Sequence, residues 1–551
     1  MNYIELADLL FPDITKTPQD YETLYPPRQL PKGAKVTRLG PSPTGFIHLG
    51  NLYGAFVNER LAHQSDGLFY LRIEDTDDKR EVEGAVEAII SSLNYFGVKF
   101  DEGATIDGEK GNYGPYYQSN RAKIYQCFVK ELLRKGLAYP CFCTEEELEN
   151  TRSRQESLKE NPGYYGPWAK CRDLTIEEIR RKVSENNPFV IRFRSQGDPN
   201  QNFEIEDGIR GTLSMPENDQ DVVILKQNGI PTYHFAHVVD DHLMRTTHVV
   251  RGEEWLSSLP IHVALFNAMN WPLPVYCHTT VLMKMEGETK RKLSKRKDPE
   301  LSLNYYRSQG YHPKAVREYV MTILNSNYEE WRMDNPDCPI EDFPFSTEKM
   351  SSSGTLFDLD KLNDISKEVL VKLKDEEIYE YLLEWAQNFR NDLELLFKEE
   401  KDTMLRILSM DRHGKKPRKD LVYCEQIFDF ISYFFDEYYK IQDTYPDTVD
   451  PEDIVPILKN YLFTYDPADD QSQWFEKIRE LSTDLGYAAK PKDYKKNPDL
   501  YKGHVGDVST VIRIALMGRA SSPDLWEIQQ IMGKSKTRDR IKQAIVKICN
   551  S

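Results

Sequence analysis

Residues 40–51 read GPSPTGFIHLGN and separate two stretches with different hydrophobic patterns. The stretch before them, KVTRL at 35–39, alternates apolar and polar residues and predicts a buried strand. The stretch after them, NLYGAFVNERLAHQ at 51–64, has the apolar spacing of an amphipathic helix. The sequence therefore predicts a strand, a loop fixed by prolines and glycines, and a helix that begins near His48 or Asn51.

A corner of this kind can bind an anion. The free N–H groups at the start of a helix and the positive end of its dipole favour a phosphate, and His48 could donate a further hydrogen bond to it. The alternative is an ordinary strand–helix loop in which Asn51 caps the helix. The His48–Gly50 corner by itself does not decide between these two interpretations.

Length and composition indicate a soluble protein with several domains. A chain of 551 residues holds roughly three to four domains. Its 39% hydrophobic and 11% aromatic content suits globular folds, and no apolar run is long enough to span a membrane. The first residues, MNYIELADLLFPDI, carry acids rather than the basic region of a signal peptide, so we expect a cytoplasmic protein.

Charge argues against a general nucleic-acid binder, because 72 basic and 89 acidic residues leave a net charge of −17. Basic clusters at 290–297, 415–419 and 534–542 could each meet phosphate, or could simply be solvated surface. An acidic body with basic stripes would suit a selective partner of one nucleic acid.

The strand–helix pattern continues beyond the opening corner. Residues 68–73 predict a second strand, and an apolar stripe from 82 to 93 predicts a helix that ends near Gly97. Such βαβα alternation is typical of a parallel sheet. The mixed region at 117–220 reads as an insertion.

Strand–helix alternation then resumes at 221–227, 247–252, 262–270 and 276–283. Beyond residue 301 the strand signals fade, and amphipathic patterns predict helices to the end, for example at 377–389, 421–435 and 538–548. Residues 490–501, KPKDYKKNPDLY, read as an exposed connector.

Eight cysteines are too few for a disulfide scaffold in a chain of this length. Cys141 and Cys143 lie close together in the sequence. From the residues alone, metal binding and plain burial both remain open for this pair.

Five motifs in a fixed order resemble the bacterial glutamyl-tRNA synthetases. In chain order they are PSPTGFIHLGN, RIEDTD (72–77), PTYHFAHVVDDHLM, HVVRGEEW and KLSKRK, and the C-terminal stretch at 503–534 resembles the terminal anticodon-binding domain of that family. HLGN and KLSKR look like the two ATP signatures of class I aminoacyl-tRNA synthetases. The match is weakest over the first thirty residues and in the middle of the helical half.

The resemblance implies an α/β fold with a Rossmann-like parallel-sheet catalytic domain, an inserted α+β domain that binds the tRNA acceptor end, and an all-helical C-terminal anticodon-binding half. The expected boundaries are 1–116 and 221–300 for the catalytic domain, 117–220 for the insertion, 301–375 for a stem-contact domain and 376–551 for the anticodon-binding domain.

The resemblance also implies the ATP site. His48 and the Gly50 corner would bind phosphate while the carboxylate of the amino acid attacks the α-phosphate, and Lys292 and Lys295 would close over the same phosphates. This is catalysis by positioning and electrostatics, with Mg²⁺ accompanying the ATP. The implied catalytic residues are His48, Lys292 and Lys295, and the implied ATP-binding residues are His48, Gly50, Asn51, Lys292, Ser294 and Lys295.

The amino-acid pocket follows from the same resemblance. Positions matching the glutamate-binding residues of the family are Arg38, Ser42, Glu74, Tyr233 and Arg251. Glu74 would hold the α-ammonium group, while Arg38 and Arg251 would pair with carboxylates. Without the resemblance, Glu74 could be a solvated turn or a Mg²⁺ site and Arg251 a structural ion pair. His237 stands where some relatives have asparagine, which argues against a direct role.

A structural Zn²⁺ ion is a further implication, because some members carry a zinc knuckle in the insertion. Cys141, Cys143 and Cys171 supply three sulfurs, and a tetrahedral site needs a fourth ligand. Asp173 stands where relatives place histidine, and Tyr165 is a rival. The alternative is that these cysteines bind no metal.

The expected partners are tRNA(Glu), L-glutamate and ATP, and the expected protein is a monomer without membrane contact. Positions matching anticodon readers are Arg513, Ser522 and Leu525, although a core helix would also explain Leu525. The expected reaction transfers glutamate through an adenylate to the 2′-hydroxyl of the terminal adenosine. Alternatives are an enzyme that also charges tRNA(Gln) and a catalytically silent tRNA-binding paralogue, whereas glutaminyl enzymes differ before the histidine and carry C-terminal β-barrels.

Overall fold

The structure is a computed structural model that describes residues 2–43, 47–77 and 82–550. Its described residues form two compact units. The N-terminal unit comprises the residues up to Tyr305 together with Val316–Leu359, and the C-terminal unit comprises Tyr306–Ala315 and the residues from Asp360 onward. Three residues of the PSPTGFIHLGN motif, 44–46, lie outside the described part.

The predicted parallel sheet is confirmed in the N-terminal unit. Strands β1 (Val36–Leu39), β2 (Leu68–Leu71) and β3 (Glu102–Thr105) run parallel, and β4 (Gly108–Lys110) pairs antiparallel with β3. Strands β10 (His248–Gly252), β11 (Val275–Thr279) and β7 (Asn202–Asp207) also run parallel, and β8 (Gly211–Pro216) extends them antiparallel. Thr247 N–H donates to the Val36 carbonyl at 2.9 Å, which brings β10 beside β1.

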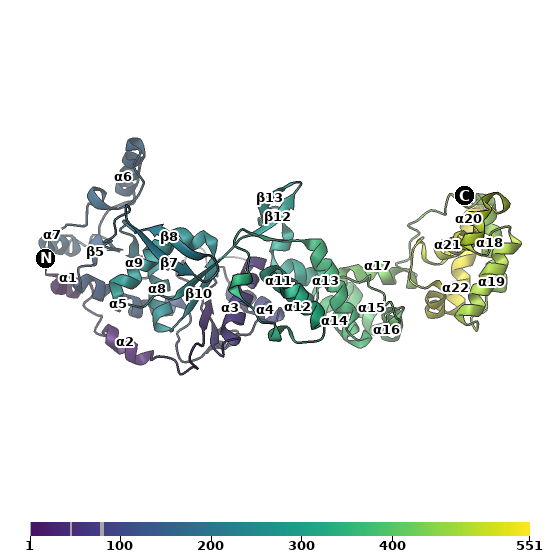
Figure 1. The fold of residues 1–551 in the computed structure, drawn as a ribbon, viewed down its shortest axis with the longest axis horizontal. Coiled ribbons are helices and arrows are strands. Elements are labelled where there is room, and N and C mark those ends of the chain that lie inside the picture. The colour runs from purple at the N-terminus through teal and green to yellow at the C-terminus, as the bar shows by residue number, and fades with distance from the viewer. Residues whose placement is uncertain (1, 44–46, 78–81, 551) are drawn as a thin grey trace. The chain divides into compact units, whose positions relative to one another are not determined.

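The helices between these strands are α3 (Leu49–His63), α4 (Ala85–Tyr95), α8 (Tyr233–Leu243) and α9 (Leu259–Met269). Leu259 of α9 belongs to one apolar cluster with Val249 of β10, and α8 packs on α9 (Figure 1). The second predicted helix begins later than its apolar stripe suggested, because Gly84 is its N-cap with a φ of 75°. Val82 therefore precedes the helix and is exposed.

A second, antiparallel sheet contains β5 (Ala138–Cys141), β6 (Val190–Phe193) and β9 (Val223–Leu225). The helices of this region are α5 (Ala122–Arg134), α6 (Glu145–Leu158) and α7 (Ile176–Ser184). The strand predicted at 221–227 is present as β9, but it pairs with β6 rather than with the parallel sheet. Conversely, β7 lies in the 117–220 segment and pairs with β11. The domain boundaries stay predictions.

The single strand predicted at 276–283 is wrong. Strand β11 ends at Thr279, and a separate strand β12 (Leu282–Glu286) forms a hairpin with β13 (Thr289–Lys292) and pairs parallel with β14 (Thr355–Leu356). The apolar run is continuous in sequence but changes sheet at residues 280–281. The helices α10 (Leu303–Gln309), α11 (Pro313–Leu324) and α12 (Tyr328–Asp334) follow.

The first thirty residues fold onto the N-terminal unit. Helix α1 (Tyr3–Leu10) packs on α5, and α2 (Pro18–Leu24) follows it. Lys130 of α5 donates to the Phe11 carbonyl at 2.8 Å, and Arg28 forms a bidentate pair with Glu102 at 3.0 Å. These residues, over which the resemblance is weakest, are therefore an integral part of the unit.

The C-terminal unit is helical, as predicted. Besides parts of α10 and α11, it contains α13 (Leu359–Val371), α14 (Asp375–Phe389), α15 (Asn391–Glu399), α16 (Lys401–Ser409), α17 (Ile427–Ile431), α18 (Pro451–Thr464), α19 (Gln471–Asp484), α20 (Pro491–Lys496), α21 (Val505–Met517) and α22 (Leu525–Cys549). Helices α18, α19, α21 and α22 pack against one another (Figure 1).

Two helix predictions in this unit need correction. The continuous helix expected at 421–435 is a series of short turns around α17, and its apolar side chains Ile427, Ile431, Tyr433 and Phe434 are all buried. The connector predicted at 490–501 is exposed but contains α20. At 421–435 burial rather than helical period decides the conformation. The described helices of the chain include none that is long and apolar enough to cross a membrane.

Candidate active site

His48 is the N-cap of α3, which confirms the predicted start of the helix. Its backbone N–H donates to Asn51 Oδ1 at 3.0 Å, so Asn51 does cap the helix, but from its third position. A Cβ on Gly50 would lie 3.1 Å from the His48 ring. Glycine at this position therefore leaves room for the imidazole at the helix start.

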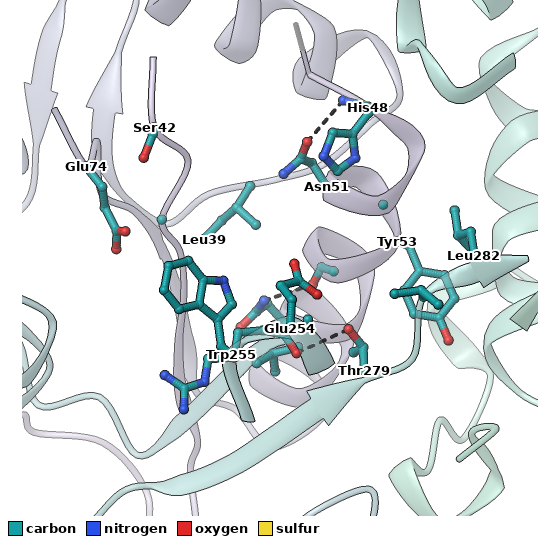
Figure 2. A pocket seen from close by; sticks show the side chains of 18 of the residues that line it. Leu39, Ser42, His48, Asn51, Tyr53, Glu74, Glu254, Trp255, Thr279 and Leu282 are labelled. Carbon is teal, nitrogen blue, oxygen red and sulfur yellow. Dashed lines mark hydrogen bonds between the residues drawn. The ribbon is translucent and has the colours of Figure 1, made fainter. Parts of the chain in front are cut away.

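A cavity of about 590 Å³ opens where β1 and β10 end and α3 begins. Figure 2 shows Ser42 and Glu74 on one side of it and His48 and Asn51 on another. The sequence-predicted residues that line it are Arg38, Ser42, His48, Gly50, Asn51, Glu74, Tyr233, Arg251, Lys292 and Lys295. The structure thus brings together predicted ATP-binding and glutamate-binding residues from two distant segments of the chain, 38–74 and 233–295.

Of the six residues expected to bind ATP, Ser294 is the one that does not line the cavity. Its N–H donates to Asp298 at 2.9 Å, and Arg291 makes a bidentate pair with the same carboxylate at 2.6 and 2.8 Å. Asp298 is buried. It therefore ties the end of the β12–β13 hairpin to the turn that carries Lys295.

His48 is neutral at physiological pH. Burial, together with the smaller effect of the positive charges of Lys295 and Lys292, lowers the pKa of His48 to about 4. Its buried Nδ1 has no hydrogen-bond partner among the described residues. A neutral imidazole offers one N–H donor and one acceptor, so His48 can still donate to an anion beside the two lysines.

A buried ion network lies behind the cavity. The guanidinium of Arg72, fully buried, donates to Asp241 at 2.6 Å and to Glu74 at 2.8 Å, and Arg38 pairs with Asp241 at 3.2 Å. Burial raises the pKa of Glu74, although Arg72 and Arg38 oppose this shift. The sequence analysis did not single out Arg72 or Asp241, even though both stand in motifs that it quoted.

Glu74 is held close to the backbone of the loop after β1. A Cβ on Gly40 would lie 2.3 Å from Glu74 Oε1, so only glycine fits there without moving the carboxylate. Arg38 is expected to pair with a ligand carboxylate, but its Nε already donates to Asp241 and its Nη1 to the Val250 carbonyl, each at 3.2 Å. Its charge is therefore largely committed within the protein.

Arg251, at the end of β10, differs from Arg38 in this respect. Its Nε donates to His278 Nε2 and its Nη1 contacts His262 Nδ1, each at 2.9 Å. Its Nη2 is buried and has no hydrogen-bond partner among the described residues. The side chain lines the cavity and is only 8% exposed. A buried guanidinium N–H without a partner is costly, so this group is suited to an anionic ligand.

Glu254 and Trp255 are among the further lining residues that were not predicted from the sequence. Both are labelled in Figure 2 and stand in the HVVRGEEW motif, which was the available signal. The Trp255 and Tyr233 rings lie 4.3 Å apart. His237 is not among the residues that line the cavity, and its Nδ1 lies 2.6 Å from Asp241.

The three predicted zinc-ligand cysteines do meet. The sulfur atoms of Cys141, Cys143 and Cys171 all lie within 4.8 Å of one another. The Tyr164 hydroxyl lies 3.4 Å from Cys141 Sγ and 3.3 Å from Cys143 Sγ. The three thiols have the donor chemistry and spacing of a small metal site.

Neither of the two expected fourth ligands reaches this cluster. Asp173 is exposed and pairs with Arg194 at 3.3 Å, and the Tyr165 hydroxyl donates to the Asn161 carbonyl. The side chain that contacts the sulfurs is that of the neighbouring Tyr164. Tyr165 is the tyrosine expected as a rival ligand, but the turn after α6 directs the side chain of Tyr164 toward the sulfurs.

The predicted anticodon residues lie in the C-terminal unit. Arg513 Nε donates to the Ser522 hydroxyl at 3.0 Å, so these two are in contact. Leu525 is 4% exposed and belongs to the apolar core, which favours the alternative that it is a core residue. In the basic cluster at 534–542, Arg540 is also buried, because it pairs with Asp436 and stacks on Tyr439.

Comparisons with known proteins match both units. Residues 35–364 match the family model for the catalytic domain of class I tRNA synthetases (E and Q), and residues 422–545 match the anticodon binding domain model. A glutamate–tRNA ligase of Acetivibrio thermocellus is 67% identical over 546 residues, covering 99% of this chain and 100% of the relative. One of Clostridium perfringens is 50% identical and covers 98% and 99%.

Among solved structures, a glutamate tRNA ligase from Elizabethkingia meningosepticum in complex with its amino acid superposes with a TM-score of 0.74 at 28% identity, covering 93% of this chain and 99% of that one. The expected fold, with its Rossmann-like sheet and helical C-terminal half, is thereby confirmed. The chain belongs to the glutamate–tRNA ligase family of class I aminoacyl-tRNA synthetases.

Proposed function

We propose that this chain joins L-glutamate to tRNA(Glu) at the expense of ATP, through a glutamyl-adenylate. Family membership supports the activity. The observation that carries the assignment of the cavity is the buried, unpartnered Nη2 of Arg251. A γ-carboxylate placed there would accept this N–H and pair with the guanidinium charge, whereas the amide of glutamine is neutral and would leave that charge unpaired.

The charge around the cavity supports an anionic amino acid. The charged side chains that line the cavity are the positive Arg38, Arg251, Lys292 and Lys295 and the negative Glu74, Asp77 and Glu254, so the four positive and three negative charges leave an excess of one positive charge. Glutamate carries one ammonium group and two carboxylates. In this proposal Glu74 holds the ammonium group and Arg251 the γ-carboxylate, with Ser42 and Tyr233 as further contacts.

The ATP half of the proposal uses the residues at the start of α3 and in the KLSKR turn. An oxygen of the α-carboxylate attacks the α-phosphorus, the bond from that phosphorus to the bridging oxygen breaks, and pyrophosphate leaves with the electron pair. His48, Lys292 and Lys295 stabilise the phosphate charge, while Gly50 and Asn51 shape the helix start. Ser294 contributes through its backbone contact with Asp298.

Mg²⁺ would arrive with the nucleotide and neutralise part of its phosphate charge. Among the described residues, the one cluster of three or more metal-ligating side chains is the cysteine group, which is far too soft a set for Mg²⁺. The second step is attack of the ribose 2′-hydroxyl of the terminal adenosine on the acyl carbon, with loss of its proton and departure of AMP. Arg513 and Ser522 remain proposed contacts of the anticodon.

We propose that Cys141, Cys143 and Cys171 hold a structural Zn²⁺ ion, with Tyr164 rather than Asp173 closest to the fourth position. The mutual distances of the sulfurs and the Tyr164 contacts support this donor set. Elemental analysis of protein purified without chelator should find one zinc ion per chain, with loss in Cys143→Ser and retention in Asp173→Asn. Absence of zinc from the wild-type protein would contradict the proposal.

The test of the function is charging of a purified tRNA pool with labelled glutamate, resolved by isoacceptor. We expect label on tRNA(Glu), dependence on ATP, and no product with labelled glutamine. Label on tRNA(Gln) as well would extend the substrate range. Failure to form any glutamyl-tRNA, with ATP–pyrophosphate exchange also absent, would overturn the proposed function.

A further inference from the structure

Arg251 is held by two histidines through ring nitrogens that must be acceptors. Its Nε and Nη1 lie 2.9 Å from His278 Nε2 and His262 Nδ1. A guanidinium has only donors, so each of these nitrogens must carry a lone pair rather than a proton. The two histidines use different ring nitrogens for the same task.

The remaining nitrogen of each ring has a partner that completes the tautomer. His278 Nδ1 lies 2.6 Å from Asp207 Oδ2, which accepts a hydrogen bond from the ring N–H. His262 Nε2 lies 3.1 Å from His234 Nδ1. His278 and His262 are both fully buried. Burial lowers the pKa of both imidazoles, in agreement with neutral rings.

We propose that His278 and His262 are positioning residues that fix the Arg251 guanidinium so that its third nitrogen, Nη2, faces the cavity. This inference rests on the proposed function, because it assumes that Nη2 receives the γ-carboxylate of glutamate. Neither histidine touches the substrate or lines the cavity. They act through Arg251, and Asp207 and His234 act through them.

The geometry explains why two acceptors are needed. With its Nε and Nη1 both bound, the planar guanidinium cannot rotate, and its free edge is defined before the ligand arrives. Loss of one acceptor would leave a buried donor unpaired and allow the plane to turn toward other acceptors such as the Tyr276 ring, whose centroid lies 4.7 Å away. Glutamate binding would then weaken without any change in the ATP half of the cavity.

The test exploits the opposite use of ring nitrogens at the two positions. The amide oxygen of glutamine can take the place of Nε2, and that of asparagine the place of Nδ1. His278→Gln and His262→Asn should therefore keep the acceptor for Arg251, whereas His278→Asn and His262→Gln should lose it. We expect KM for glutamate to rise about tenfold or more in the second pair and no more than about threefold in the first.

Aminoacylation kinetics with varied glutamate and varied ATP provide the measurement. KM for ATP should stay within about twofold in all four variants, and melting temperatures will show whether each variant is folded. The expected order of the variants is crossed: KM for glutamate should be lower with glutamine than with asparagine at position 278, and lower with asparagine than with glutamine at position 262. A space-filling role of the histidines would not produce this pattern. Comparable losses in both members of each pair would overturn the inference.

Arg251→Gln separates this inference from the proposed function. If Arg251→Gln loses glutamate but the histidine variants show no crossed order, the positioning role is wrong and the function proposal stands. If Arg251→Gln leaves KM for glutamate unchanged, the assignment of the γ-carboxylate to Arg251 is wrong, and the inference falls with it.

Discussion

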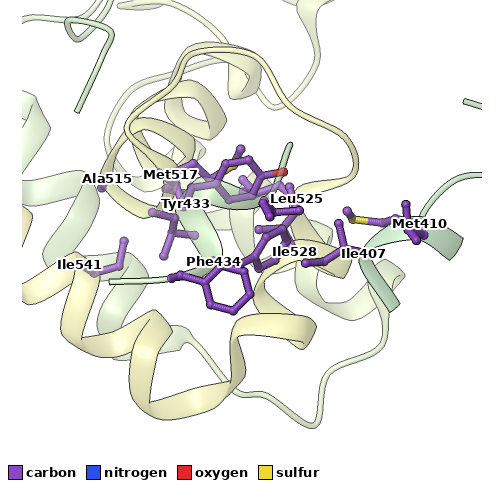
Figure 3. Packing of buried hydrophobic residues seen from close by; sticks show 14 of the residues in the cluster. Ile407, Met410, Tyr433, Phe434, Ala515, Met517, Leu525, Ile528 and Ile541 are labelled. Carbon is purple, nitrogen blue, oxygen red and sulfur yellow. The ribbon is translucent and has the colours of Figure 1, made fainter. Parts of the chain in front are cut away.

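The cavity of the N-terminal unit and the core of the C-terminal unit bury side chains by opposite means. Behind the cavity, buried Arg72, Asp241 and Glu74 satisfy one another with ion pairs and hydrogen bonds. In the C-terminal unit, apolar side chains such as Leu525, Ile528 and Ile541 fill the space between helices (Figure 3). The first arrangement fixes the direction of charged groups, whereas the second mainly supplies stability.

We expect the largest single loss of folding stability from a substitution that breaks the buried ion network behind the cavity. Arg72→Met would leave Asp241 and Glu74 buried without their shared partner, which costs about 3–5 kcal/mol. Calorimetry should show the loss in the transition that glutamate and ATP stabilise. The exposed pair Arg152 and Glu156 offers a matched control, because Arg152→Met should cost less than about 1 kcal/mol. Equal losses at both sites would contradict the contrast.

Truncation in the apolar core is expected to cost slightly less and to leave amino-acid recognition intact. Leu525→Ala and Ile528→Ala each remove a buried side chain, with an expected loss of about 2–5 kcal/mol in the C-terminal unit. KM for glutamate should stay within about twofold at a temperature where both variants are folded. A Leu525→Ala variant that keeps its stability but loses tRNA affinity would instead make Leu525 an anticodon contact.

Lys295→Ala tests the phosphate side of the cavity. Its ammonium group should meet phosphate charge mainly in the transition state, so glutamate activation measured with tRNA present should slow by about a hundredfold, or about 3 kcal/mol. Lys297→Ala is the control, because Lys297 lies in the same turn but does not line the cavity. A rate within about twofold of the wild type would show that the turn is wrongly assigned.

Gly40→Ala tests whether Glu74 must keep its position. The added Cβ would lie 2.3 Å from Glu74 Oε1 and force the carboxylate away from Arg72. We expect KM for glutamate to rise about tenfold, the effect of one lost charged hydrogen bond, with KM for ATP unchanged. An unaltered KM for glutamate would remove Glu74 from the pocket.

The smallest effect concerns pH and the neutral histidines. Because burial holds the pKa of His262 well below its ordinary value of 6.5, the unfolded chain binds a proton that the folded chain does not as the pH falls below 6.5. Stability is therefore present above pH 6.5 and lost below it, by about 1 kcal/mol at pH 5.5 for each such histidine. His262→Asn should reduce the acid-induced fall in melting temperature, and an identical fall would mean that His262 is protonated in the folded chain.

Much of this architecture was predictable because it is written in local patterns. The strand before residue 40, the helix start at His48 and the parallel sheet follow from hydrophobic period and turn residues, and the cavity residues stand in recognisable motifs. The prediction of one continuous helix at 421–435 is wrong because its apolar residues are buried on several sides, so their helical spacing did not indicate the conformation. The prediction of a single strand at 276–283 is wrong because a continuous apolar stretch does not show where the chain passes from one sheet to another.

The supports of the site were harder to predict. Asp207, His262 and His278 come from β7, α9 and β11, and only the fold brings them to Arg251. Taken singly, a histidine in an apolar segment looks like any core residue. The same holds for Tyr164, whose approach to the cysteines depends on the turn after α6 and not on spacing.

The most direct measurement of the central claim is the ratio of kcat/KM for glutamate to that for glutamine in the wild type and in Arg251→Gln. The unpartnered Nη2 predicts that kcat/KM for glutamate falls by about a thousandfold in the variant and that the gap to glutamine narrows, because the charged donor that distinguishes the two ligands is gone. A variant that still prefers glutamate as strongly as the wild type would show that Arg38 or another group reads the side chain.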